Sequence, residues 1–340
     1  MRNINKFRGC LVGGAAGDAL GYAVEFLSKD KIFSMYGRQG ITEYSLRNGT
    51  AIISDDTQMT LFTANGLLIA DDRKADYIDS IREMYKCWYR TQTESYPSAD
   101  KTESFLMDVP ELFNRRAPGM TCMTAIKAGA KGTTTDPVND SKGCGGVMRV
   151  APVGLYFSDT EISYDQSDMI AAEAAALTHG HELGFIPAAA LAHIVRAVIE
   201  SDIPLKYAVT DSITAVEKLF PDAETLCEFT ELMEEAVTLS ESEMDVKEAV
   251  YQLGDGWVAE ETLAIAVYCA LKYQDDFDKA MIASVNHDGD SDSTGAVCGN
   301  ILGAYLGYDA IPQKYKDNLE LHDLIVKLSD DLYSGKIITV

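Results

Sequence analysis

The sequence predicts a single all-α domain that spans residues 1–340. Three observations support this prediction. Apolar residues recur at helical spacing along most of the chain, whereas the alternation of apolar and polar residues that is typical of strands is scarce. Two stretches carry glycine at every fourth residue. No linker rich in Pro, Gly and Ser, no low-complexity run and no clear repeat divides the chain into parts.

The two glycine stripes predict two closely packed helices. The first stripe consists of Gly9, Gly13, Gly17 and Gly21, and the second of Gly295, Gly299, Gly303 and Gly307. Residues four apart lie on one face of a helix, and a glycine there costs about 1 kcal/mol relative to alanine. We therefore expect both stripes to serve close helix–helix packing. The two helices are candidates to pack against each other.

The remaining elements follow in chain order. We expect a loop with one short strand over 28–50, then a helix over 58–70 with an acidic N-terminus. Further helical regions are expected over 79–90, 121–130, 171–200, 204–220, 223–240 and 319–332, and an apolar helix over 263–271 within the stretch 248–272. A polar loop over 91–101 and a turn-rich stretch over 132–141 separate some of them.

Residues 286–295 concentrate acidic and hydroxyl side chains. Asp288, Asp290 and Asp292 stand at alternate positions, with three hydroxyl residues beside them. Carboxylate and hydroxyl oxygens are the ligands that Mg²⁺, Mn²⁺ and Ca²⁺ require. The same residue types are preferred at helix N-caps and in first turns. Because three acids within five residues repel one another, the pattern favours a metal site, and capping can hold at the same time.

A second cluster of similar composition precedes the helix expected over 58–70. It consists of Ser54, Asp55, Asp56 and Thr57. Each of the two clusters leads into a helix that is apolar enough to be buried. They look like the two halves of one metal site, although more than 200 residues separate them.

A glycine-rich loop lies within residues 142–152. Within it, three of the four residues from Gly143 to Gly146 are glycine. Their exposed backbone N–H groups would suit an anion such as diphosphate. A tight turn between two helices explains the loop equally well. Arg149, just after the loop, would pair with phosphate or, more commonly for a buried arginine, with a neighbouring carboxylate.

Several other site classes are not indicated. No G-x-G-x-x-G follows a strand, and no G-x-x-x-x-G-K-[ST] phosphate loop occurs. His179 and His181 stand two residues apart and would not share a helix face, which argues against a two-histidine zinc site. One of them would still be able to line a pocket.

Charge and cysteine usage narrow the class of protein. Acids outnumber bases 53 to 29, for a net charge of −24. The negative electrostatic potential of such a protein repels phosphate backbones and attracts cations, so we expect no nucleic-acid partner. The seven cysteines are scattered without a C-x-x-C pair, as is typical of reduced thiols. No apolar run reaches the roughly 20 residues of a membrane span, and no signal peptide is evident. We therefore expect a cytoplasmic protein without a membrane partner.

Four motifs together resemble the ADP-ribosylglycohydrolase family, the relatives of dinitrogenase reductase-activating glycohydrolase. In the family's order they are GDALGYAVEF, SDDTQM, KGCGGVMRVAPVG with the later THGH, and GDSDSTGA. The resemblance covers about residues 7–307, and the SDDT and GDSDS motifs are highly specific as a pair. It implies an all-α fold with two divalent cations, Mg²⁺ or Mn²⁺, in a central cleft.

The resemblance also implies roles for single residues. Cation ligands would be Ser54, Asp55, Asp56, Asp290, Asp292 and Ser293, with serine where relatives often have threonine. Glu25, otherwise an ordinary solvated helix end, matches a glutamate that gates the metal centre and contacts substrate. Together with it, the candidate catalytic groups are Asp55, Asp56 and Asp292. Substrate contacts are implied for Gly143, Cys144, Gly145, Gly146, Val147, Met148 and His179. Relatives often have Gly-Asn-Thr where this chain has Gly119-Met120-Thr121, so the contact of Thr121 stays open.

The implied activity is metal-dependent removal of ADP-ribose from a modified protein, most simply from arginine. Hydrolysis at the ribose anomeric carbon passes through an oxocarbenium-like state, with one carboxylate accepting a proton from water. Relatives also act on serine-linked ADP-ribose, poly(ADP-ribose) or O-acetyl-ADP-ribose. Two further alternatives are a catalytically silent ADP-ribose-binding protein and a two-metal phosphoesterase. Six intact ligand-type residues argue against the first, and a total of five histidines argues against the second.

Overall fold

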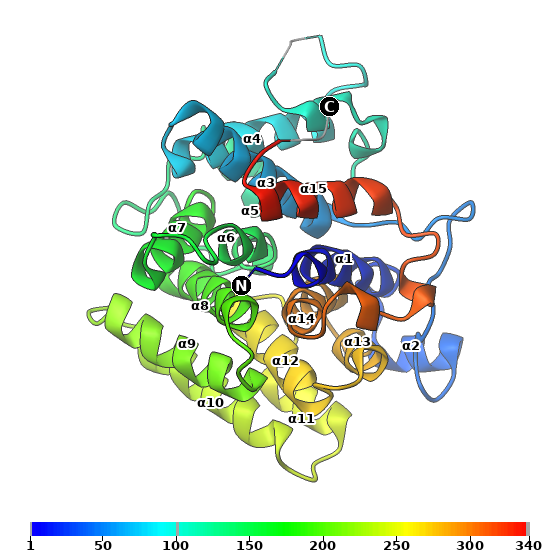
Figure 1. The fold of residues 1–340 in the computed structure, drawn as a ribbon. Helices are drawn as coiled ribbons and strands as arrows, with labels where there is room; N and C mark the ends of the chain where they lie inside the picture. The colour runs from blue at the N-terminus through cyan, green and yellow to red at the C-terminus, as the bar shows by residue number, and fades with distance from the viewer. Residues whose placement is uncertain (1, 100–101, 338–340) are drawn as a thin grey trace.

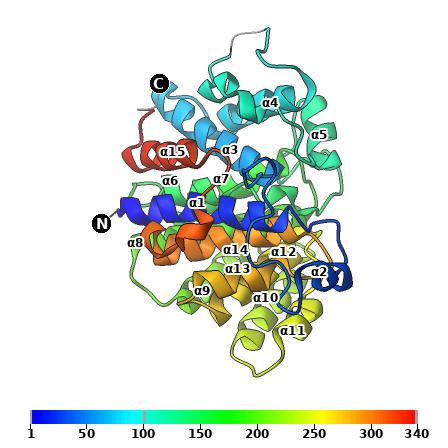
Figure 2. The ribbon, with the colours of Figure 1, turned by 90° about the vertical axis from the view of Figure 1, so that its right-hand side faces the viewer.

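Two antiparallel helices, α1 (Ile4–Gly21) and α14 (Ser291–Leu306), lie at the centre of the molecule. In this computed structural model, which describes residues 2–99 and 102–337, they run side by side in both ribbon views (Figure 1, Figure 2). A Cβ at Gly9, Gly13 or Gly17 would lie less than 3.0 Å from the carbonyl oxygen of a glycine in the other stripe. Only glycine lets the backbones approach this closely. The predicted packing is confirmed, and the two stripes face each other.

The other helices surround this pair (Figure 1). On one side lie α3 (Asp55–Arg73), α4 (Tyr77–Thr93), α5 (Met120–Lys127) and α15 (His322–Ser334). On the other sides lie α2 (Lys29–Tyr36), α6 (Ala151–Tyr156), α7 (Tyr164–Ala176), α8 (Glu182–Glu200), α9 (Leu205–Leu219), α10 (Leu226–Ser240), α11 (Val246–Leu253), α12 (Ala259–Lys272) and α13 (Phe277–Val285). The predicted all-α class is confirmed, since the described residues form helices and isolated bridges but no strand.

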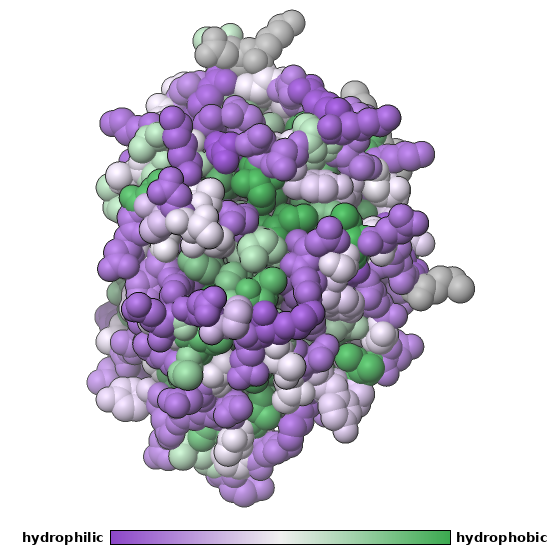
Figure 3. All heavy atoms as spheres, turned by 90° about the vertical axis from the view of Figure 1, so that its left-hand side faces the viewer, coloured by the Kyte–Doolittle hydropathy of each residue, from purple (hydrophilic) through white to green (hydrophobic). Residues whose placement is uncertain are grey.

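Buried apolar side chains form one continuous core through these helices. The face drawn in Figure 3 is largely hydrophilic, with apolar atoms in the hollows between charged side chains. The helix α8 is long and apolar enough to cross a membrane by composition alone, but 94% of the stretch is buried inside the protein. That burial is typical of a core helix. All seven cysteines are free thiols, as expected.

Some of the predicted elements were wrong. The stretch 28–50 contains α2 instead of a strand, and the Ser28 hydroxyl caps this helix by accepting from Lys31 N. The region 171–200 is divided into α7 and α8, with His181 as the N-cap of α8. The helix expected over 263–271 lies within α12, whereas α11, which ends at Gly254 with a φ of 123°, was not predicted. The short helices α6 and α13 were not predicted at all.

Candidate active site

The two acidic clusters meet in one cavity at the N-termini of α3 and α14. Asp55, Asp56, Asp290 and Asp292 line this cavity of about 280 Å³ together with Glu25. Glu25 follows the end of α1, which antiparallel packing places beside the start of α14. One oxygen each of Glu25, Asp290 and Asp292 lie within 4.8 Å of one another. The clusters that looked like two halves of a site are therefore neighbours in space.

Each cluster also caps its helix. The Ser54 hydroxyl accepts from Asp56 N at 3.2 Å at the start of α3. The Asp290 carboxylate accepts from Ser293 N at 3.3 Å at the start of α14. Acids in the first turns suit the positive ends of the helix dipoles. The capping interpretation is correct, and it leaves the carboxylates facing the cavity.

Asp18 supports the first cluster and was not among the predicted site residues. It is fully buried in α1. Its carboxylate accepts from Ser54 N at 2.9 Å, from Thr57 N at 3.1 Å and from the Thr57 hydroxyl. Burial raises the pKa of Asp18 to about 6 in spite of these hydrogen bonds. A single acid within an otherwise apolar, glycine-striped helix was the signal that would have identified it.

The charges of this cavity are unbalanced, because no Lys or Arg is among the described residues that line it. Burial and the nearby Asp290 and Asp55 raise the pKa of Glu25 to about 9. Burial raises the pKa of Asp55 to about 8. It also raises the pKa values of Asp56 and Asp292 well above the ordinary carboxyl range, with their acidic neighbours adding to the effect.

The donor set fits hard divalent cations. Glu25 Oε2 and Asp56 Oδ2 are buried without a hydrogen-bond partner. Buried polar atoms are normally paired, so two unpaired carboxylate oxygens in one cavity are suitable ligands for a cation. Mg²⁺ and Mn²⁺ both accept carboxylate and hydroxyl oxygens. Five of the six predicted cation ligands line the cavity, and the exception is Ser54, which is fully buried behind it.

The glycine-rich loop forms another part of the wall. It is a short 3₁₀ turn, Cys144–Gly146, followed by α6. The Cys144 thiol lies 2.7 Å from Asp290 Oδ2, which joins the loop to the acidic cluster. The predicted substrate residues divide into two groups. Those that line the cavity are Gly143, Cys144, Gly145, Met148, Thr121 and His179, and those that do not are Gly146 and Val147, which pack into the interior.

His179 lies against this loop, and Arg149 does not reach the cavity. A Cβ at Gly145 would lie 2.9 Å from His179 Cε1. Burial, with Arg149 nearby, lowers the pKa of His179 to about 3, so the ring is neutral. Arg149 is fully buried and donates to Ala174 O at 2.9 Å and to Thr178 Oγ1 at 2.7 Å. Both partners expected for Arg149 were wrong, because the end of α7 supplies its acceptors.

Sequence reasoning missed the apolar rim of the cavity. Phe26 and Trp257 stack with ring centroids 6.1 Å apart, and they are 71% and 44% exposed. Met120, 69% exposed, lines the same cavity. The segment containing Met120 also reaches the acidic cluster, because Gly119 N donates to Asp55 Oδ2 at 3.2 Å. No local pattern connects residue 26 with residue 257, so only the fold shows this pair.

Comparisons with known proteins show what this chain is similar to in sequence and in fold. The family model described as ADP-ribosylglycohydrolase matches residues 1–337. The ADP-ribosylhydrolase ARH3 of Mus musculus is 25% identical over 94% of this chain and 88% of its own length. An ADP-ribosylarginine hydrolase of Serratia proteamaculans is 27% identical over 97% of this chain and 80% of its own length. A solved structure, an ADP-ribosylglycohydrolase-related protein complex, shares the fold with a TM-score of 0.68 at 24% identity, covering 98% of both chains.

Proposed function

Because this chain belongs to the ADP-ribosylglycohydrolase family, we propose that it removes ADP-ribose from arginine side chains of modified proteins. The family acts on ADP-ribosylated substrates and releases ADP-ribose. The observation that carries the proposal is the meeting of Asp55, Asp56, Asp290 and Asp292 with Glu25 in one cavity. The arginine linkage is supported by the Serratia relative, whose name specifies ADP-ribosylarginine.

Two divalent cations, Mg²⁺ or Mn²⁺, complete the proposed site. Asp55, Asp56, Asp290, Asp292 and the Ser293 hydroxyl would hold them, with Ser54 as a sixth predicted ligand. When bound, the cations supply Lewis acidity for ribose hydroxyls and for an attacking water. The excess of buried acids and their raised pKa values support this proposal, since the carboxylates cannot all ionise side by side without positive charge.

Side chains of the protein would accept a proton and hold the carboxylates in position. Glu25 has an unpaired, buried carboxylate oxygen beside Asp290 and Asp292, which suits it to hold the proton of an attacking water. Asp55 is positioned by Gly119 N, and Asp290 by Ser293 N. These hydrogen bonds fix the carboxylates on rigid helix ends, as orientation of a reacting group requires.

The apolar and neutral parts of the cavity would receive the ligand itself. The loop Gly143–Gly145 with Met148 and neutral His179 offers backbone and ring groups beside the acids. Thr121 lines the same side, with its hydroxyl 3.3 Å from Ser141 Oγ. We propose these residues for contacts to ADP-ribose. The net charge of −24 supports modified proteins instead of nucleic acid as partners. We also propose a cytoplasmic protein without a membrane partner, and its free cysteines support a reducing compartment.

The test is product release from arginine-ADP-ribosylated and serine-ADP-ribosylated proteins with Mg²⁺, Mn²⁺ or EDTA. We expect free ADP-ribose from the arginine substrate, abolished by EDTA and by the double variant Asp290→Ala/Asp292→Ala. A matched control removes two exposed acids that do not line the cavity, Asp222→Ala/Glu224→Ala, and should retain full activity.

Other outcomes would replace the proposal in defined ways. Release from the serine substrate alone would keep the cation-dependent site and refute the arginine linkage. Tight ADP-ribose binding without turnover on either substrate would indicate a binding protein. Release of AMP would indicate a phosphoesterase.

A further inference from the structure

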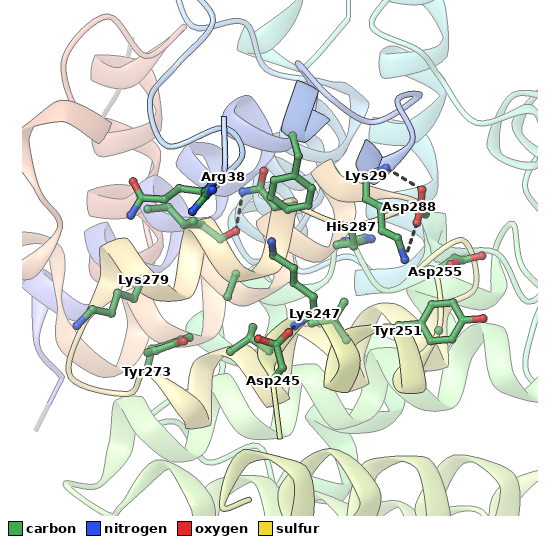
Figure 4. Close-up of a pocket in the computed structure, with 18 residues that line it drawn as sticks. Lys29, Arg38, Asp245, Lys247, Tyr251, Asp255, Tyr273, Lys279, His287 and Asp288 are labelled. Atoms are coloured by element: carbon green, nitrogen blue, oxygen red, sulfur yellow. Dashed lines mark hydrogen bonds and ion pairs between the residues drawn. The ribbon is translucent and has the colours of Figure 1, made fainter. Parts of the chain in front are cut away.

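A second cavity lies behind the segment that carries the acidic cluster, between α2, α11 and α13 (Figure 4). Its volume is about 330 Å³, and it shares no lining residue with the carboxylate cavity. Residues 286–288 face this second cavity, whereas Asp290 and Asp292 face the first. The two cavities are therefore separated by one short stretch of chain. Nothing in the proposed hydrolysis uses the second cavity.

The cavity contains unpaired positive charge in a strongly acidic protein. Figure 4 shows Lys247 extending from α11 toward the middle of the cavity, with Arg38 across from it. Within the described residues, neither side chain forms an ion pair with a carboxylate, and the Lys247 amine lies 3.7 Å from the Phe33 ring centroid. Lys29, by contrast, is paired with Asp288 at 3.5 Å. Two cations are thus left available to an anionic group.

His287 provides a buried hydrogen-bond acceptor in the cavity wall. Its Nε2 lies 3.0 Å from the Ser284 carbonyl oxygen, which can only accept, so Nε2 carries the proton. Its Nδ1 then has a free lone pair, and this atom is buried without a partner while the whole residue is only 7% exposed. A buried acceptor left unpaired is destabilising, and a ligand N–H or O–H group would relieve that penalty.

The remaining wall is mainly apolar. Phe33, Val250 and Ile282 face the cavity, and they suit a flat or branched hydrocarbon body. Besides Asp288, which is paired with Lys29, two acids also line it, Asp245 and Asp255. Asp245 caps α11 by accepting from Lys247 N, and a ligand donor group would be compatible with Asp255.

We propose that this cavity binds a small organic acid with an apolar body and an N–H or O–H group. Its anionic group lies between Arg38 and Lys247, its body lies against Phe33, Val250 and Ile282, and its donor bonds His287 Nδ1. This site is independent of the proposed hydrolase reaction.

Three related probes separate the components of the proposal. Indole-3-acetate carries the anion, the apolar body and the N–H group. The analogue 1-methylindole-3-acetate lacks the donor, and indole-3-acetamide lacks the charge. Calorimetry and saturation-transfer NMR on the full chain should show one bound indole-3-acetate, with both analogues at least about fivefold weaker.

Variants locate the binding. Arg38→Ala/Lys247→Ala should weaken indole-3-acetate at least about tenfold, because both charge-assisted contacts are lost. The control Arg73→Ala/Lys218→Ala removes the same residue types from the surface outside both cavities and should bind normally. Ala283→Phe, which fills the cavity from α13, should abolish binding, with the melting temperature reporting that each variant is folded. Equal affinity for the three probes, no binding at millimolar concentration, or undiminished binding by the double variant would overturn the proposal.

Discussion

Adding one methyl group at the contact of α1 and α14 should separate two helices and damage the cation site at the same time. In Gly295→Ala, the new Cβ would lie 2.5 Å from Gly17 O and 2.8 Å from Val285 Cγ1. Ordinary contact begins at 3.4 Å, so α14 must move by about 0.9 Å in a close-packed interior. It is blocked by backbone on one side and by α13 on the other.

The free-energy cost of Gly295→Ala follows from two opposing effects. Overpacking a core position costs about 1–3 kcal/mol, and two simultaneous overlaps place this site near the upper end. The gain in helix propensity of about 1 kcal/mol offsets part of it. A net loss of about 2 kcal/mol, with an unfolding entropy of about 0.7 kcal/mol/K for this chain length, lowers the melting temperature by about 3 °C.

Calorimetric melting and Mn²⁺ titration test this prediction together. We expect Mn²⁺ affinity to fall at least about tenfold, because Asp292 and Ser293 move with α14 while Asp55 and Asp56 stay with α3. The control is Gly119→Ala, where a Cβ meets nothing within 4 Å and the melting temperature should change by less than about 1 °C. A higher melting temperature for Gly295→Ala, as helix propensity alone would give, would refute the packing argument.

Three further predictions concern pH, thiols and a buried ion pair. Because the folded-state pKa values of Glu25 (about 9) and Asp55 (about 8) exceed the ordinary carboxyl values, the folded state binds more protons. The stability of the cation-free protein should therefore fall as pH rises from 5 to 8. Over the same pH range, the rise in melting temperature that Mn²⁺ causes should become larger. Thermal scans in which either quantity changes in the opposite direction would contradict this prediction. Ellman's reagent should react quickly with one of the seven native thiols, the exposed Cys227, because burial raises the pKa of the half-buried Cys144 and the other five thiols are buried. Cys227→Ser should remove that fast phase, and a persisting fast phase would show that Cys144 or a buried thiol is reactive. The ring of His193 lies 2.7 Å from the buried carboxylate of Asp168. The variant His193→Leu should lower the free energy of unfolding in urea by about 3–5 kcal/mol and leave product release unchanged. A loss below about 1 kcal/mol would mean that this pair contributes little to stability.

Local patterns correctly predicted those parts of the fold in which the spacing of residues along the chain determines their role. The glycine stripes specified α1 and α14 because a four-residue repeat has meaning only on a helix face. The acids Asp55 and Asp290 were recognisable because a dense acidic cluster before an apolar helix has few structural explanations. Polar spacing gave no such signal for α2, whose residues resemble a loop and whose helix depends on the Ser28 cap.

Long-range contacts explain what the sequence did not show. Asp18 gains its role only when Ser54 and Thr57 donate to it across 36 and 39 residues. Arg149 was assigned a phosphate or a carboxylate, but the fold offers it carbonyl oxygens at the end of α7. The turn of the loop points Val147 into the core, while Cys144 faces the cavity. The residue types in the motif do not predict this difference in orientation.

The close packing of α1 against α14 also has a consequence for biosynthesis. On the ribosome α1 is made first, and its partner begins 270 residues later, at Ser291. At a synthesis rate of about 5–20 residues per second, about 15–55 s pass between the synthesis of α1 and that of α14, which covers the glycine face of α1. Glu25 follows α1 and Asp290 precedes α14, so the acidic site forms only when α14 packs against α1. A nascent or truncated chain that lacks α14 therefore holds no complete site.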